Sequence, residues 1–194
     1  MQTQDIVQFY LADLGQLLAK VEAPWIERLV DALAKAWKNG KRVLLMGNGG
    51  SSSSVSHIVA DLQKNIQMAT GTPLRALCLS DCTPLLMAWA NDTTWSNVFV
   101  PQIACWIEPG DVVIGVSGSG NSMNVINGIQ MARQNGATTF GMAGFDGGKL
   151  KDTADDCLVV DSNNMQRVED VHMVTLHVVF TALQERAMSE QPVL

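Results

Sequence analysis

Two short segments rich in glycine and serine, each directly after a run of apolar residues, constrain this chain more than any other feature. The first segment is Gly47-Asn48-Gly49-Gly50-Ser51-Ser52-Ser53-Ser54 and the second is Ser117-Gly118-Ser119-Gly120-Asn121-Ser122. Apolar runs of this kind are typical of parallel strands that are covered on both faces. Glycine lets the backbone approach a ligand closely, while serine hydroxyls and the free N–H groups of a following helix donate to an anion. The two segments therefore predict two halves of one phosphate cradle.

The chemistry of these segments also limits the ligand. Neither segment contains a lysine, whereas a nucleoside triphosphate loop needs that cation beside its glycines. We therefore expect a ligand with a single phosphate. The structural alternative is a tight turn followed by a serine helix cap, but two matched segments after two strands favour an anion site.

Length, composition and charge exclude several classes of protein. The 194 residues, 47% of them hydrophobic, are enough for one domain with a sizeable core. The formal net charge of −6 argues against a nucleic-acid surface, which needs clustered lysine and arginine. The sequence contains neither a basic-then-apolar leader nor an apolar stretch of the roughly 20 residues that span a bilayer. We expect a soluble, cytoplasmic protein without nucleic-acid or membrane partners.

The hydrophobic periodicity alternates between helix and strand along the chain. Apolar residues recur at three and four positions over 5–20 and 24–38, which predicts two helices at the beginning of the chain. Continuous apolar runs and helical patterns then follow one another, which predicts a single α/β domain with a doubly wound, five-stranded parallel sheet. The expected strands are 42–46, 74–79, 112–116, 138–142 and 158–160, and the expected later helices are 55–67, 85–91, 124–135 and 168–188.

Ligands of open parallel sheets bind beyond the carboxyl ends of the strands, where the strand order reverses. Both glycine-serine segments are predicted to lie at such ends. Asp81 and Asn91-Asp92 follow the strand predicted at 74–79 and are candidates to line the same crevice.

The histidines and nearby acids suggest a metal. His57 and Asp61 are four residues apart, so they share one face of the helix that follows the first segment, where they could bind a divalent ion. An exposed polar pair is the alternative. The last predicted helix adds a second cluster of potential ligands, Glu169, Asp170, His172 and His177. Two histidines and two carboxylates would also neutralise a Zn²⁺ ion.

Helix geometry restricts this ligand set. Glu169 and His177 are eight residues apart, which on a straight helix is about 12 Å and too far for one ion. Either Glu169 precedes the regular helix, or the site combines residues of two chains. His172 is expected to be a core or interface histidine.

Together, these residues resemble the SIS (sugar isomerase) domain family, and within it the phosphoheptose isomerases. The resemblance covers nearly the whole chain. It is carried by the two N-terminal helices and by an ordered series of motifs: Gly47-Asn48-Gly49-Gly50-Ser51, His57 with Asp61, Asn91-Asp92, Ser117 to Ser122, Phe145-Asp146-Gly147-Gly148, and Arg167-Val168-Glu169-Asp170-Val171-His172 leading to His177.

The resemblance implies a flavodoxin-like sheet, aldose–ketose isomerisation of sedoheptulose 7-phosphate in lipopolysaccharide heptose biosynthesis, and a cytoplasmic homotetramer with sites between subunits. It assigns residues 1–40 to oligomer packing and 41–194 to the α/β layers. It also implies roles for individual residues: Ser51, Ser117, Ser119 and Ser122, with Gly118, for the phosphate; Asn48, Gly49, Gly50, Asn91, Asp92 and Glu169 for the substrate; His57, Asp61, Glu169 and His177 for a divalent metal such as Zn²⁺; Asp61 and His177 for proton transfer.

The chain departs from the family pattern at three places. The family usually has Glu at Asp61, Gln at Glu169 and Ser-Thr-Ser at 117–119. The shorter carboxylate of Asp61 moves its oxygens by roughly an ångström, a shift that can cost about a hundredfold in rate in a proton-transfer site. Glu169 could compensate, on this substrate or on another.

Two other functions are compatible with parts of the sequence. The SIS family includes non-catalytic relatives such as the DnaA initiator-associating protein, a protein-binding adaptor in which the metal-set acid and the late histidine are replaced by uncharged residues. Asp61 and His177 favour the enzyme here. A dinucleotide-binding oxidoreductase would explain Gly47-Asn48-Gly49, but Ser52 stands where its third glycine belongs.

Overall fold

A parallel sheet of five strands forms the centre of the computed structural model, which describes residues 2–190. The strand order is β2-β1-β3-β4-β5, so the direction of winding reverses between β1 and β3. This is the point at which doubly wound sheets bind ligands. The strands are β1 (Arg42–Gly47), β2 (Arg75–Cys78), β3 (Val112–Ser117), β4 (Thr138–Gly144) and β5 (Asp156–Val160).

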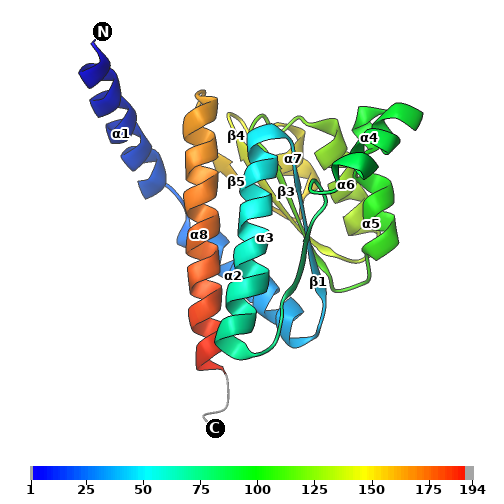
Figure 1. Cartoon of the computed structure of the whole chain (residues 1–194). Coiled ribbons are helices and arrows are strands. Elements are labelled where there is room, and N and C mark those ends of the chain that lie inside the picture. Colours follow the sequence, from blue (N-terminus) through cyan, green and yellow to red (C-terminus); the bar gives the residue numbers. More distant parts are fainter. Residues whose placement is uncertain (1, 191–194) are drawn as a thin grey trace.

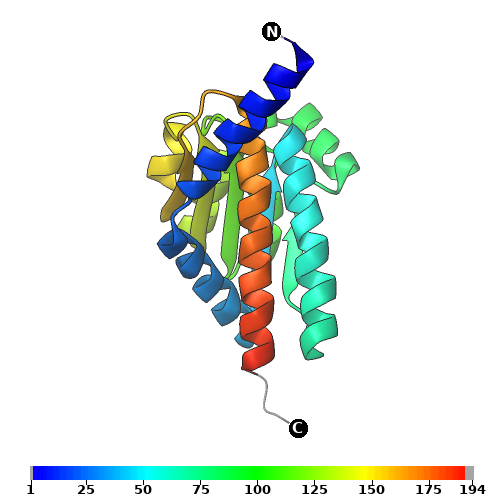
Figure 2. The same ribbon diagram turned by 90° about the vertical axis from the view of Figure 1, so that its left-hand side faces the viewer.

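Helices cover both faces of the sheet (Figures 1 and 2). One face packs against α2, α3 and α8, and the other against α4 to α7. The helices are α1 (Thr3–Ala19), α2 (Ala23–Lys38), α3 (Gly49–Thr70), α4 (Thr83–Asp92), α5 (Val100–Trp106), α6 (Met123–Gln134), α7 (Gly148–Thr153) and α8 (Met165–Ser189), with a 3₁₀ turn at η1 (Trp95–Asn97). None of these helices, within residues 2–190, is long and apolar enough to cross a bilayer.

Helices α3 and α8 lie side by side and both begin at the carboxyl edge of the sheet (Figures 1 and 2). Helix α2 packs beside them because its apolar residues recur every four positions: Trp25, Leu29 and Leu33 are all buried. The Trp25 ring meets Phe140 of β4 edge-on, with 6.1 Å between ring centroids. The parallel pair of α3 and α8 therefore brings two helix N-termini to the edge where ligands bind.

Helix α1 projects away from the rest of the chain in Figure 1. Its attachment is to the first turns of α8: the Tyr10 hydroxyl donates to Asp170 at 2.6 Å, and Arg167 pairs with Asp13 at 2.9 Å. The Arg167 guanidinium also stacks over the Tyr10 ring, 4.9 Å from its centroid. The outer part of α1 exposes large apolar side chains, among them Ile6, Val7, Phe9 and Leu11.

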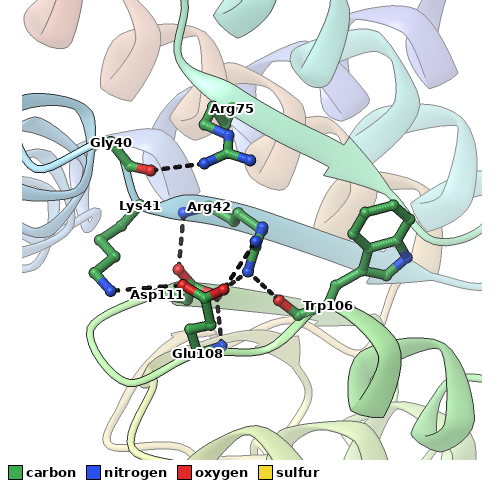
Figure 3. Close-up of polar contacts among 7 residues, drawn as sticks. All are labelled: Gly40, Lys41, Arg42, Arg75, Trp106, Glu108 and Asp111. Carbon is green, nitrogen blue, oxygen red and sulfur yellow. Dashed lines mark hydrogen bonds and ion pairs between the residues drawn. The ribbon is translucent and has the colours of Figure 1, made fainter.

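A polar cluster closes the opposite, amino edge of the sheet (Figure 3). The fully buried Asp111 carboxylate accepts the backbone N–H of Arg42 at 2.9 Å and that of Glu108 at 2.8 Å. The Arg42 guanidinium donates to Glu108 at 3.0 Å and to the Trp106 carbonyl. A buried carboxylate is tolerated only with such partners, and here it holds the beginnings of β1 and β3 together.

The sequence-based fold is confirmed, with three differences of detail. Helix α3 begins at Gly49, so most of the first glycine-serine segment is the first turn of a helix and not a loop before it. The structure also contains α5 and α7, which the sequence pattern did not indicate. These helices have seven and six residues, too few to show a periodicity.

Candidate functional site

A cavity of about 270 Å³ lies at the carboxyl ends of β1 and β3, where the two glycine-serine segments meet. Gly47 of β1 is paired with Val116 of β3, so the segments that follow these strands are held next to each other. This confirms that the two segments face one space. The lining residues are Asn48, Gly49, Gly50, Ser51, Val116, Ser117, Gly118, Ser119, Ser122, Met165 and Glu169.

Hydrogen bonds within the second segment orient its hydroxyls. The Ser117 hydroxyl donates to Ser122 Oγ at 3.0 Å, which directs the Ser122 proton away from Ser117. The backbone N–H of Asn121 donates to Ser119 Oγ at 3.2 Å, so the Ser119 proton is likewise free for another acceptor. Ser122 is the N-cap of α6, whose first N–H groups have no partner inside the helix. The segment therefore presents donors that suit an anion.

A pair of amide side chains joins the two segments. Asn48 Nδ2 donates to Asn124 Oδ1 at 2.9 Å, and Asn124 Nδ2 donates back to Asn48 Oδ1 at 2.8 Å. Asn124 is 1% exposed, and its Oδ1 also accepts the Val125 N–H at 3.0 Å. Sequence reasoning missed Asn124, because no local pattern shows a contact across 76 residues; an amide in the first, buried turn of a helix was the available signal.

The turn after β4 supports the second segment from behind. Gly120 has φ +64°, and a Cβ there would lie 2.0 Å from the carbonyl oxygen of Gly147. The Leu150 N–H donates to the Gly120 carbonyl at 2.9 Å. A Cβ on Gly118 would lie 2.3 Å from Met165 Sδ, so Met165 of α8 fills the space that a side chain at position 118 would take. Backbone contact thus sets the shape of the cradle at Gly120, and the Met165 side chain adjoins it at Gly118.

Glu169 of α8 reaches the cavity from the side of α3. A Cβ built on Gly50 would lie 2.6 Å from Glu169 Oε1 and 2.9 Å from Oε2. The carboxylate therefore rests against the first turn of α3, and a side chain at position 50 would make it move. Asn48, the N-cap of α3, makes no side-chain cap bond to that helix, since its amide is paired with Asn124.

His57, Asp61 and His177 form a separate group on the outer face of α3 and α8. One ligand atom from each lies within 4.8 Å of the others. His57 Nε2 is 3.0 Å from His177 Nε2 and 3.5 Å from Asp61 Oδ2. Two ligand atoms bound to one tetrahedral Zn²⁺ are about 3.3 Å apart, so the two distances from His57 suit such an ion. Asn65 Nδ2 donates to the other Asp61 oxygen at 3.2 Å, which fixes the orientation of the carboxylate.

Two expectations about this site need correction. Glu169 lies inside the regular part of α8, so the alternative in which it precedes the helix is wrong, and within the described chain it does not join the histidine group. Asn91 and Asp92 are exposed at the end of α4, where Asn91 Nδ2 donates to Asp92 Oδ1 at 2.8 Å, and they do not line the cavity.

His172 is a core residue, as expected. It is 1% exposed, and its Nε2 lies 3.1 Å from the Ala143 carbonyl oxygen, so this nitrogen carries the proton and donates. Burial lowers the pKa of His172 to about 4, which keeps the ring neutral. The hydrogen bond ties α8 to the end of β4, one residue before the Gly144 N–H that donates to the Gly118 carbonyl at 2.9 Å.

Comparison with known proteins gives a consistent result. The SIS domain model matches residues 9–144. The phosphoheptose isomerase of Geotalea daltonii is 36% identical over 185 residues, covering 95% of this chain and 93% of the relative. That of Aquifex aeolicus is 38% identical over 171 residues, covering 87% and 88%. The phosphoheptose isomerase structures from Francisella tularensis and Neisseria gonorrhoeae superpose with TM-scores of 0.89 and 0.86, at 25% and 26% identity, each over 95% of this chain and all of the other.

The chain has a doubly wound sheet with a serine-lined cavity at its switch point, and the SIS domain model matches residues 9–144, so this chain belongs to the SIS domain family. Within that family it belongs to the phosphoheptose isomerases.

Proposed function

We propose that this protein is an aldose–ketose isomerase that interconverts sedoheptulose 7-phosphate and D-glycero-D-manno-heptose 7-phosphate. The observation that carries the proposal is that the chain contains both chemistries that the reaction needs. The first turns of α3 and α8 line an anion cavity, and His57, Asp61 and His177 lie farther along these helices, where a neighbouring subunit could receive them. In this proposal the reaction takes place in the cytoplasm and provides the heptose phosphate from which lipopolysaccharide heptose is made.

The reaction moves a proton between adjacent carbons through an enediolate, so it needs a base at carbon and an acid at oxygen. We assign the base to Asp61 and the acid to His177, with the roles exchanged in the reverse direction. The cavity residues Ser119 and Ser122 hold the remote phosphate, whose binding energy positions the reacting carbons.

His57, Asp61 and His177 supply two imidazole nitrogens and one carboxylate, the donor set of many catalytic zinc sites. The side chain of His57 is 52% exposed, so a fourth position is accessible to substrate. A divalent ion bound there would act as a Lewis acid toward the carbonyl oxygen.

The active form in this proposal is a homotetramer whose sites lie between subunits. On α3, His57 is six residues beyond Ser51, which is about 9 Å along the helix axis, so the histidine group and the cavity of one chain are separate. A neighbouring subunit would bring its own group to the cavity. The exposed apolar residues of α1, together with Val174 and Val178 of α8, are the surface we assign to subunit contacts.

The activity is tested by incubating the protein with sedoheptulose 7-phosphate, with and without chelator, and following the product by NMR. Asp61→Asn and His177→Gln should each abolish isomerisation, and chelation should lower it. Glu185→Gln, on the exposed side of α8, is the matched control. Turnover by either site variant within a few-fold of the wild type would reject this mechanism. Tight binding of a replication protein without a stoichiometric metal would instead support an adaptor.

The placement of sites between subunits has its own test. Ser119→Asp should disable the cavity by charge repulsion, and His177→Gln should disable the histidine group. Mixed oligomers of these two inactive variants regain activity only if one site takes its cavity and its histidine group from different chains. Mixtures that remain inactive, although exchange of subunits is verified by mass spectrometry, would place each site within one chain.

A further inference from the structure

The charge of the cavity is unusual for a site that binds a phosphate. Among the residues that line it within residues 2–190 there is no lysine or arginine, and the one charged side chain is the Glu169 carboxylate. A phosphate in this cavity is therefore stabilised by dipoles and hydroxyls, and it is opposed by one full negative charge.

The position of Glu169 divides the cavity into two halves. Its carboxylate rests on Gly50, in the first turn of α3, where the helix dipole and the unpaired N–H groups favour a negative charge. The N-cap Asn48 leaves those groups uncapped, because its amide is committed to Asn124. The half beside α3 thus already contains an anion that belongs to the protein.

The half beside α6 has the opposite character. Ser119 and Ser122 direct hydroxyl protons away from their partners in the second segment. Helix α6 begins at Met123, and its first N–H groups, apart from that of Val125, have no partner inside the helix. Donors are concentrated there, and the resident carboxylate is on the α3 side. An incoming phosphate is most stable on the α6 side.

We propose that Glu169 is a charge filter: it confines the phosphate to the α6 half and makes the α3 half accept only uncharged, hydroxyl-bearing groups. A carboxylate accepts hydrogen bonds from sugar hydroxyls, and the adjacent N–H groups of α3 donate to the same hydroxyls. A second phosphate or a carboxylate in that half meets Glu169 as a like charge. The site therefore selects sugar monophosphates and rejects sugar bisphosphates and phosphorylated sugar acids. This inference rests on the proposed function only in taking the cavity as the phosphosugar site.

The test compares two ligands that differ only in the second phosphate, sedoheptulose 7-phosphate and sedoheptulose 1,7-bisphosphate, together with inorganic phosphate. Calorimetric titrations use the wild type, Glu169→Gln and Asp170→Asn, each with and without chelator. Asp170 is the matched control: it is the next residue of α8, removing its carboxylate changes the net charge equally, and it faces the Tyr10 hydroxyl instead of the cavity. Circular dichroism verifies that each variant is folded.

We expect Glu169→Gln to lower the preference for the monophosphate over the bisphosphate by about tenfold or more and to tighten inorganic phosphate several-fold, the scale of one like charge a few ångströms away. Asp170→Asn should change the preference by less than about threefold, because its charge is farther away and screened. An unchanged preference in Glu169→Gln, or an equal change in Asp170→Asn, would overturn the proposal. So would an effect that disappears in chelator, which would mean that Glu169 acts through a bound metal.

The outcome separates this inference from the proposed function. Wild-type protein that binds the monophosphate but does not isomerise it would refute the proposed activity and leave the filter standing. An isomerase whose Glu169→Gln variant keeps the wild-type ligand preference would refute the filter alone. Absence of binding by every ligand to every variant would overturn both.

Discussion

The amide pair of Asn48 and Asn124 yields the most quantitative prediction of this structure. The two side chains exchange two neutral hydrogen bonds, of 2.9 and 2.8 Å, between segments that follow different strands. A neutral hydrogen bond contributes about 1 kcal/mol net, so the pair should show a coupling free energy of about 2 kcal/mol. Asn48→Ala alone should cost roughly 2–3 kcal/mol, because it leaves the Asn124 amide buried without its partner.

The assay is a double-mutant cycle with Asn48→Ala, Asn124→Ala and the double variant, unfolded in urea at one protein concentration. The double variant should be more stable than the sum of the single effects predicts, by the coupling free energy. For a chain of this size each kcal/mol lowers Tm by about 2–4 °C, so Asn48→Ala should melt about 5–10 °C below the wild type. Asn39→Ala is the control, since Asn39 Nδ2 bonds only an exposed carbonyl of its own helix, that of Lys35, at 2.7 Å.

A coupling below about 0.5 kcal/mol would refute the reasoning, because independent sites are additive within that limit.

The same double-mutant cycle can be measured on phosphate binding. If the pair holds the two halves of the cradle in register, both single variants should weaken phosphate binding, and the double variant should be no weaker than the worse of the two. Full additivity in binding would mean that each amide acts on the ligand separately.

Three further predictions follow from other contacts. Gly120→Ala should lower the free energy of unfolding by roughly 2–3 kcal/mol, because of strain at φ +64° and contact with the Gly147 carbonyl. It should also weaken phosphate binding in calorimetry. A variant with wild-type affinity and stability would contradict this. His172 has a folded-state pKa of about 4 against a usual 6.5. The stability that its neutral, buried ring contributes is complete above pH 6.5 and falls by about 3 kcal/mol as the pH drops to 4. The wild type should therefore lose that much more stability than His172→Gln over this range, and parallel curves of stability against pH would reject the prediction. Asp111→Asn should cost about 3 kcal/mol by leaving the buried ion pair incomplete. Glu108→Gln should cost much less in the same urea titration, because the Glu108 side chain is exposed.

The sequence predicts those parts of the molecule that depend on patterns of neighbouring residues. Strand runs, helical periodicity and the two glycine-serine segments all depend on residues within one element, and the parallel topology then places the segments at one edge. Two contacts could not be predicted in this way: the pairing of Asn48 with Asn124, and the contact of Gly50 with Glu169. Both depend on how far apart two elements lie in space, and hydrophobic periodicity gives no information about that distance. Helix spacing alone already separated Glu169 from His177, and only the family resemblance placed both in one metal set.

The proposed phosphate site has no lysine or arginine among the lining residues that the structure describes, so it depends on dipoles and hydroxyls for charge stabilisation. A lysine can adjust its side chain to an anion, but the N–H groups of α3 and α6 can stabilise charge only where the helices themselves are placed. A Cβ on Gly120 would meet the Gly147 carbonyl, whereas a Cβ on Gly50 or Gly118 would meet the side chain of Glu169 or Met165. Backbone contact therefore restricts the second segment most strongly at Gly120. With a net charge of −6, the protein does not attract phosphosugars over long distances, so recognition depends on the geometry of these few contacts.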